Sequence, residues 1–177
     1  MFKKYIPFAV AKSIYEIDMM FFKKNNVKIL LMDLDNTLDS YRLFHPTDKA
    51  IQLISELRKN DILPIIISNN KGKRVSSYAN DLKIEYLNSA AKPFGFRINR
   101  FIKQHGWNKE EIMFVGDQMI TDVKAAKRVG IKVVLTEKIV KEDQWTTVFN
   151  RFFGRKIRKY HMKRNNLIDW RNKYGEN

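Results

Sequence analysis

Short apolar runs alternate with segments of helical spacing through the middle of the chain. The apolar runs have strand length and cover 27–33, 65–68, 84–87, 112–116 and 132–136. Runs that are apolar at consecutive positions indicate strands buried on both faces, as in a parallel sheet. The run at 84–87 is the weakest of the five.

Helical patterns separate these runs. The first begins at Thr47, and the others cover about 72–82, open at Pro93, and extend from about Thr121 to a glycine cap at Gly130. Strands that alternate with helices in this way predict an α/β fold. We expect a five-stranded parallel sheet that is covered by helices on both faces.

Both ends of the chain carry amphipathic patterns outside this core. Within 8–24, apolar residues recur at spacings of four, three and four, which predicts one amphipathic helix. A second apolar stripe, beneath a basic face, consists of Phe149, Phe152, Phe153, Ile157 and Tyr160. Two interpretations are open for each pattern: packing on the sheet or on the other end, or contact with a membrane surface.

Charge is unevenly distributed over the 177 residues, which carry a formal net charge of +15. Residues 1–28 contain six bases and two acids, and residues 151–177 contain nine bases and two acids. The segment between them is nearly balanced, with 19 bases and 15 acids. Basic ends fit an anionic surface, either nucleic acid or acidic lipid.

The composition excludes several kinds of chemistry and location. The chain has no cysteine, so thiol nucleophiles, thiolate metal sites and disulfides are excluded. No run approaches the roughly 18 to 20 apolar residues that a membrane-spanning helix needs. The short apolar run near the N-terminus soon meets Lys12, so we interpret it as mature sequence rather than a signal peptide. We expect a cytoplasmic protein, and the basic ends suggest peripheral contact with the inner face of the membrane as an alternative.

Acidic residues follow two of the predicted strands. Asp33 and Asp35 end the first run in DLDNTL, and Asp117 and Asp122 follow the fourth run in VGDQMITD. Because the carboxyl ends of parallel strands meet at one edge of a sheet, these carboxylates are expected to converge. Clustered carboxylates repel one another unless a hard cation lies between them, and oxygen ligands favour Mg²⁺.

The ends of two other strands supply complementary groups. Ser68, in IIISNN, offers a hydroxyl near a helix start, and Lys92, in AAKPFG, offers a cation before the Pro93 helix. Carboxylates, a divalent cation, a hydroxyl and a lysine together suit phosphoryl transfer, which needs positioning and charge neutralisation. By residue type alone, nearby polar residues are more typical of loop stabilisers: Asn36, Thr37, Asn69 and Asn70.

These motifs resemble, in order, the four motifs of the haloacid dehalogenase superfamily. They are DLDNT, Ser68 in SNN, Lys92 in AKP, and GDQMITD. Over essentially its full length, the chain is similar to the YqeG family of class IIIA phosphatases in that superfamily. The resemblance implies a three-layer Rossmannoid fold and a hydrolase that acts on phosphoric monoesters.

The resemblance also implies roles for the motif residues. Asp33 would be the nucleophile that forms an aspartyl-phosphate, and Asp35 would be the general acid and then the general base. Mg²⁺ would be held by Asp33, the Asp35 backbone carbonyl and Asp117, with Asp122 as a further ligand or an orienting residue. The phosphoryl group would be bound by Ser68, Asn69 and Lys92.

The spacing of the motifs bears on the domain organisation. Only 32 residues separate Asp35 from Ser68, and 23 separate Ser68 from Lys92, which leaves no room for the superfamily's cap domain. We expect a single domain over 1–177. It would comprise a catalytic core at about 27–140, an N-terminal amphipathic helix at about 8–24 and a basic helical tail at about 141–177.

The substrate is less constrained than the reaction. An uncapped site is open, and the family is similar to phosphatidylglycerophosphate phosphatases of the mitochondrial type, so the resemblance implies this lipid as substrate. One alternative is a phosphatase of small metabolites or phosphoproteins whose basic ends pack on the core. Another is a protein that associates with nucleic acid or the ribosome through its basic tail. The sequence leaves the oligomeric state open.

Overall fold

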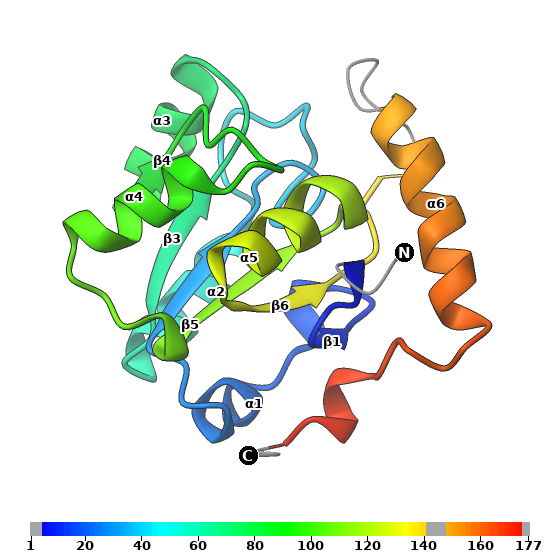
Figure 1. The fold of residues 1–177 in the computed structure, drawn as a ribbon. Helices are drawn as coiled ribbons and strands as arrows, with labels where there is room; N and C mark the ends of the chain where they lie inside the picture. Colours follow the sequence, from blue (N-terminus) through cyan, green and yellow to red (C-terminus); the bar gives the residue numbers. More distant parts are fainter. Residues whose placement is uncertain (1–4, 141–147, 175–177) are drawn as a thin grey trace.

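Six parallel strands form one sheet, and helices cover both of its faces (Figure 1). The computed structural model describes residues 5–140 and 148–174, with the backbone alone for 148–152. The strand order is β1-β6-β5-β2-β3-β4. The strands are β1 (Ala9–Val10), β2 (Ile29–Met32), β3 (Leu63–Ile67), β4 (Glu85–Leu87), β5 (Ile112–Gly116) and β6 (Lys132–Leu135).

Helices connect the strands, as the alternating pattern predicts. They are α1 (Met19–Lys24), α2 (Asp48–Lys59), α3 (Lys73–Asp81), α4 (Phe96–Gln104), α5 (Lys124–Val129) and α6 (Val148–Met162). A π-helical turn, η4 (Met119–Val123), precedes α5. Short 3₁₀ segments include η2 (Ile14–Glu16), η3 (Lys109–Glu111) and η6 (Trp170–Asn172).

The strands have apolar residues at consecutive positions because both faces of the sheet are buried. Leu30 and Met32 of β2 lie in one core, which includes residues of α1, α2 and α3. Leu31 lies in the other core, which includes residues of α4, α5 and α6. The predicted α/β architecture with a parallel sheet is thus confirmed, with six strands rather than five.

The sixth strand comes from the segment that we expected to form one helix over 8–24. That expectation was wrong: the segment contains β1, η2 and the six-residue helix α1. The Ser13 side chain accepts a hydrogen bond from the Tyr15 backbone, and the Asp18 side chain accepts one from the Met20 backbone. Each side chain therefore caps a new element and ends the preceding one. The apolar residues at helical spacing still point inward, since Ile14, Ile17 and Phe21 are buried.

The described part of the C-terminal segment packs against the rest of the chain. α6 lies alongside η4, and Ile157 is buried in the core that contains Met119. Further on, the Ile168 carbonyl accepts a hydrogen bond from the Val10 backbone, and Trp170 packs edge-on against Phe21. Of the predicted stripe, Phe153 is exposed and Tyr160 is half-buried, whereas the side chains of Phe149 and Phe152 lie outside the described residues.

The connections between motifs are short, as expected for a chain without a cap. Residues 36–62 form a loop and α2, and residues 69–84 form a loop and α3. In the described ranges, none of the helices has the length and apolar character to cross a membrane.

Candidate active site

The carboxyl ends of the central strands carry the polar residues of the motifs. Asp33 directly follows β2, and its backbone donates to the Val115 carbonyl, which extends the pairing with β5 by one residue. Asp117 directly follows β5, and Ser68 directly follows β3. Strand pairing therefore fixes the relative positions of these three residues.

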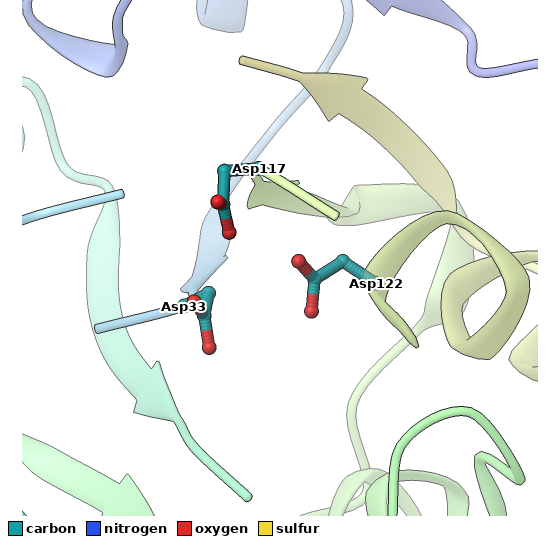
Figure 2. Close-up of side chains that lie close together, drawn as sticks. All are labelled: Asp33, Asp117 and Asp122. Atoms are coloured by element: carbon teal, nitrogen blue, oxygen red, sulfur yellow. The ribbon is translucent and has the colours of Figure 1, made fainter. Parts of the chain in front are cut away.

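Three carboxylates face one another at this edge (Figure 2). One oxygen from each of Asp33, Asp117 and Asp122 can be chosen so that all three lie within 4.8 Å of one another. All three residues are largely buried, with exposed fractions of 4%, 8% and 0%. Oxygens that bind one Mg²⁺ at about 2.1 Å lie roughly 3 to 4 Å apart, so these carboxylates fit a shared divalent cation.

Lys92 reaches the same cluster from the loop after β4. Its ammonium forms ion pairs with Asp33 and, at 2.8 Å, with Asp122, and it donates to the Ile67 carbonyl at 3.1 Å. Burial alone would lower the pKa of this ammonium, but the carboxylates of Asp122 and Asp33 raise the pKa above its usual value. These ion pairs favour the charged form of Lys92 in the site. A divalent cation would further reduce the repulsion among the three carboxylates.

The Asp33 carboxyl responds to these surroundings. Burial raises its pKa well above the usual value, Lys92 lowers it, and the nearby Asp122, Asp117 and Asp35 raise it further. Without a bound cation, ionised Asp33 is thus unfavourable in its own site. Strongly shifted carboxyl groups of this kind are typical of functional sites.

Gly116 allows the close approach of Asp122. A Cβ atom at position 116 would lie 2.6 Å from the Cβ, Cγ and Oδ2 atoms of Asp122. The π-helical turn places Asp122 there, with its backbone donating to the Gln118 carbonyl and its Oδ2 accepting from the Gln118 backbone at 2.9 Å. Any side chain at 116 would displace Asp122 from the cluster.

The Asp35 side chain lies outside this group of three carboxylates. Strand alternation suggested that Asp33 and Asp35 converge, but β2 ends at Met32, and Asp35 lies in a turn that bridges to Asp39. Its Oδ1 forms an ion pair with Arg74 at 2.5 Å, and its Oδ2 accepts from the Asn70 amide at 3.3 Å. Sequence reasoning overlooked Arg74, because it follows two lysines in a basic turn and belongs to none of the four motifs.

Ser68 and Asn69 have different surroundings. Ser68 is buried, and its hydroxyl accepts from the Asn70 backbone at 3.1 Å. Asn69 braces the Lys92 loop: its amide donates to the Lys92 carbonyl, and its side-chain oxygen accepts from the Lys92 backbone, both at 2.8 Å. These contacts are those of a residue that positions Lys92.

Comparison with known proteins assigns this arrangement to a family. A sequence model of the family described as haloacid dehalogenase-like hydrolase matches residues 2–136. The chain belongs to the haloacid dehalogenase-like hydrolases. It is 33% identical over 168 residues to the "Probable phosphatase YqeG" of Bacillus subtilis (strain 168), which covers 95% of this chain and 97% of that protein.

Two further similar proteins are more distant. The chain is 24% identical over 150 residues to "Phosphatidylglycerophosphate phosphatase 1, chloroplastic/mitochondrial" of Arabidopsis thaliana, which covers 78% of this chain and 42% of that protein. The crystal structure of 3-deoxy-D-manno-octulosonate 8-phosphate phosphatase from Yersinia pestis superposes with a TM-score of 0.52 at 18% identity, over 73% of this chain and 75% of that one. This structure shows the shared fold. Together with the family assignment, the phosphatase relatives identify the chain as a haloacid dehalogenase-like phosphatase, a hydrolase of phosphoric monoesters.

Proposed function

We propose that the chain is a Mg²⁺-dependent phosphatase that works through an aspartyl-phosphate on Asp33. The observation that carries this proposal is the buried cluster of Asp33, Asp117 and Asp122, in which the Lys92 ammonium pairs with Asp33 and Asp122. The fourth predicted ligand is the Asp35 backbone carbonyl. Bound there, the cation would neutralise charge on the transferring phosphoryl group and on the carboxylates.

The proposed reaction has two displacements. A carboxylate oxygen of Asp33 attacks phosphorus, the bond from phosphorus to the ester oxygen breaks, and the Asp35 carboxyl gives its proton to the departing oxygen. Asp35, now a carboxylate, then takes a proton from the water that attacks phosphorus in the aspartyl-phosphate. That second displacement releases inorganic phosphate and restores both aspartates. Lys92 and Ser68 would bind the phosphoryl oxygens in both steps.

Phosphatidylglycerophosphate is the substrate that we propose. Its support is the similarity to the Arabidopsis thaliana phosphatidylglycerophosphate phosphatase, together with an uncapped site that a phosphate on a large surface could reach. The basic face of α6 adds electrostatic support, because Arg155, Lys156 and Lys159 are exposed. Each such cation near an anionic leaflet contributes about 1 kcal/mol of attraction. The protein would then work as a peripheral protein on the inner face of the membrane.

A second candidate is a phosphatase of soluble phosphomonoesters or phosphoproteins. The observation that favours it is the burial of Ile14, Ile17 and Phe21, which occupies the apolar N-terminal stripe within the core. A related alternative is that the basic face of α6 binds nucleic acid, such as ribosomal RNA.

The experiment that separates these candidates compares substrates and surfaces. Turnover of phosphatidylglycerophosphate in anionic vesicles is measured beside turnover of soluble phosphoesters. A triple variant with Arg155, Lys156 and Lys159 changed to Gln is compared with a charge-matched control that changes the exposed Lys49, Lys59 and Lys103 to Gln. We expect the α6 variant alone to lose vesicle binding and lipid turnover while retaining activity on the soluble ester. Turnover confined to soluble esters would favour the second candidate, and retention on structured RNA but not on vesicles would favour nucleic acid.

A further inference from the structure

Arg74 holds the Asp35 side chain from the first turn of α3. The ion pair between Arg74 Nη1 and Asp35 Oδ1 measures 2.5 Å, and the two side chains are only 11% and 17% exposed. A guanidinium is planar and always charged, so a contact of this kind fixes the orientation of a carboxyl group as well as its position. A free carboxyl group at the end of a turn would otherwise rotate.

The other nitrogens of Arg74 bind the loop that follows Asp35. Nε donates to the Leu43 carbonyl at 2.7 Å, and Nη2 donates to the Ser40 carbonyl at 3.1 Å. One guanidinium thus connects a carboxylate to two backbone carbonyls within nine residues of chain. Because three protein acceptors hold Arg74 itself, it is a rigid support for Asp35.

Two cations pair with different aspartates at this edge of the sheet. Lys92 is paired with Asp33 and Asp122, in the cluster that fits a metal. Arg74 is paired with Asp35, whose side chain lies outside that cluster. Within the proposed reaction, the first cation belongs with the phosphoryl group and the second with the proton donor.

A second contact from α3 supports the same loop but does not touch Asp35. Tyr78 lies four residues after Arg74 on α3, and its hydroxyl donates to Asp39 Oδ2 at 2.5 Å. Residues four apart lie on the same side of a helix, so α3 holds the loop at Asp35 and again at Asp39. Loss of the second contact would loosen the loop without removing the partner of Asp35.

We propose that Arg74 is a positioning residue that orients Asp35 for proton transfer to the leaving-group oxygen. This inference rests on the proposed function, in which Asp35 is the general acid. Arg74 pairs with Asp35 Oδ1. The other oxygen, Oδ2, accepts the longer hydrogen bond from Asn70 and is the one that carries the transferred proton. As the ester bond to phosphorus breaks, that proton moves to the departing oxygen, and Arg74 keeps all of its own protons.

The test uses the dependence of the rate on the leaving group. p-Nitrophenol leaves readily without a proton, whereas the alcohol of glycerol 3-phosphate needs one, so only the second substrate depends strongly on a general acid. The measured quantity is kcat/KM, because it reports phosphoryl transfer to the enzyme whatever the later rate of hydrolysis. We expect Arg74→Gln to lower kcat/KM for glycerol 3-phosphate by roughly 10- to 100-fold, since general acid catalysis contributes about 100- to 10,000-fold. For p-nitrophenyl phosphate we expect a loss of less than about threefold, because that leaving group needs little of the acid's contribution.

Control variants test whether the selective loss arises from the contact with Asp35 or from a general loss of structure. Arg58 also donates to two backbone carbonyls, those of Leu82 and Lys83, so Arg58→Gln controls for a lost structural arginine. Tyr78→Phe controls for a loosened loop. Both controls are expected to lower the Tm while leaving the ratio of the two kcat/KM values unchanged. Asp35→Asn should show the same selectivity as Arg74→Gln, but to a greater extent.

The double variant provides the strictest readout. If Arg74 acts through Asp35, adding Arg74→Gln to Asp35→Asn should cause no further selective loss. Equal losses on both substrates in Arg74→Gln, or no loss, would overturn the positioning role provided that Asp35→Asn is selective. If Asp35→Asn itself is unselective, the general acid assignment in the proposed function fails instead. Should Arg74→Gln not fold, Arg74→Lys retains the charge and loses the planar geometry, and its selectivity decides the question in the same way.

Discussion

The buried cluster of Asp33, Asp117 and Asp122 contrasts with the nearby pair of Asp35 and Arg74. The cluster brings three carboxylates together, and one ammonium, that of Lys92, pairs with Asp33 and Asp122. Asp35 has an arginine of its own and an amide donor on its other oxygen. The cluster of three carboxylates suits a divalent cation. The pair of Asp35 and Arg74 suits a carboxyl group whose side chain is oriented by protein groups and not by a metal. Four aspartates at one sheet edge are thus divided by their partners into two kinds of site.

The largest loss of activity is expected from a change of the proposed nucleophile in the cluster, Asp33. Asp33→Asn should lower phosphatase activity by several orders of magnitude, because an amide does not form the aspartyl-phosphate at a useful rate. The fold should persist, as circular dichroism would show, because Asn has nearly the same shape. Near-normal turnover by Asp33→Asn would refute the assignment of Asp33.

Activity should depend on a cation bound at the cluster of Asp33, Asp117 and Asp122. Chelation should abolish turnover, and Asp117→Ala should either abolish activity or raise the Mg²⁺ concentration needed for half-maximal rate, because one ligand is lost. Activity is measured against free Mg²⁺ concentration, with Arg58→Gln as the control that retains the wild-type requirement. Full turnover in excess chelator would contradict the proposed cation dependence.

Gly116→Ala should disturb the cluster and leave the pair intact. The added methyl group must push Asp122 away, since it would lie 2.6 Å from that side chain. Displacement of a site group by about 1 Å can cost on the order of 100-fold in rate, so we expect a loss of about that size together with weaker Mg²⁺ binding. Gly154→Ala is the control, because a Cβ there makes an ordinary contact with Met119 at 3.7 Å. If Gly116→Ala binds Mg²⁺ and turns over substrate as the wild type does, Asp122 contributes neither to Mg²⁺ binding nor to catalysis.

The smallest effect concerns stability and pH. The pKa of Asp33 is raised in the folded protein, so the stability that its protonated form supports is present at low pH and is lost as pH rises through that pKa. A cation requires the ionised form and binds the folded state, so it restores stability where the carboxyl has lost its proton. Mg²⁺ should therefore raise the Tm more at pH 7.5 than at pH 5, as differential scanning fluorimetry would show. An equal rise at both values would show that Asp33 does not ionise in this way.

The sequence predicted the central strands and the strand-end residues of the site better than it predicted the N-terminal segment. Consecutive apolar runs indicated the central strands, because both faces of the sheet are buried, and strand ends then placed Asp33, Ser68 and Asp117 at one edge. The partner of Asp35 lay beyond this reasoning, because Arg74 reaches it through a helix and a loop whose tertiary contacts leave no periodic signal. Gly116 was overlooked for a similar reason, since the space that Asp122 needs is defined only when η4 folds back.

The N-terminal segment illustrates the limit of periodicity. Its spacing of four, three and four matched a helix, yet the burial of Ile14, Ile17 and Phe21 is achieved by a strand, a 3₁₀ turn and a short helix. Ser13 and Asp18 were visible as capping residues and would have divided the segment. Pairing of β1 with β6 is a long-range contact, which the local pattern of apolar residues does not encode.

The central claim, that Asp33 carries the phosphoryl group, is tested most directly by trapping the intermediate. Wild-type protein is mixed with Mg²⁺ and p-nitrophenyl phosphate, quenched in acid within the first turnovers, and digested for mass spectrometry. The account predicts one phosphoryl group on the peptide that contains Asp33, and none on the same peptide from Asp33→Asn or from wild-type protein in chelator. A phosphoryl group on another residue, with that peptide unmodified throughout active turnover, would contradict it.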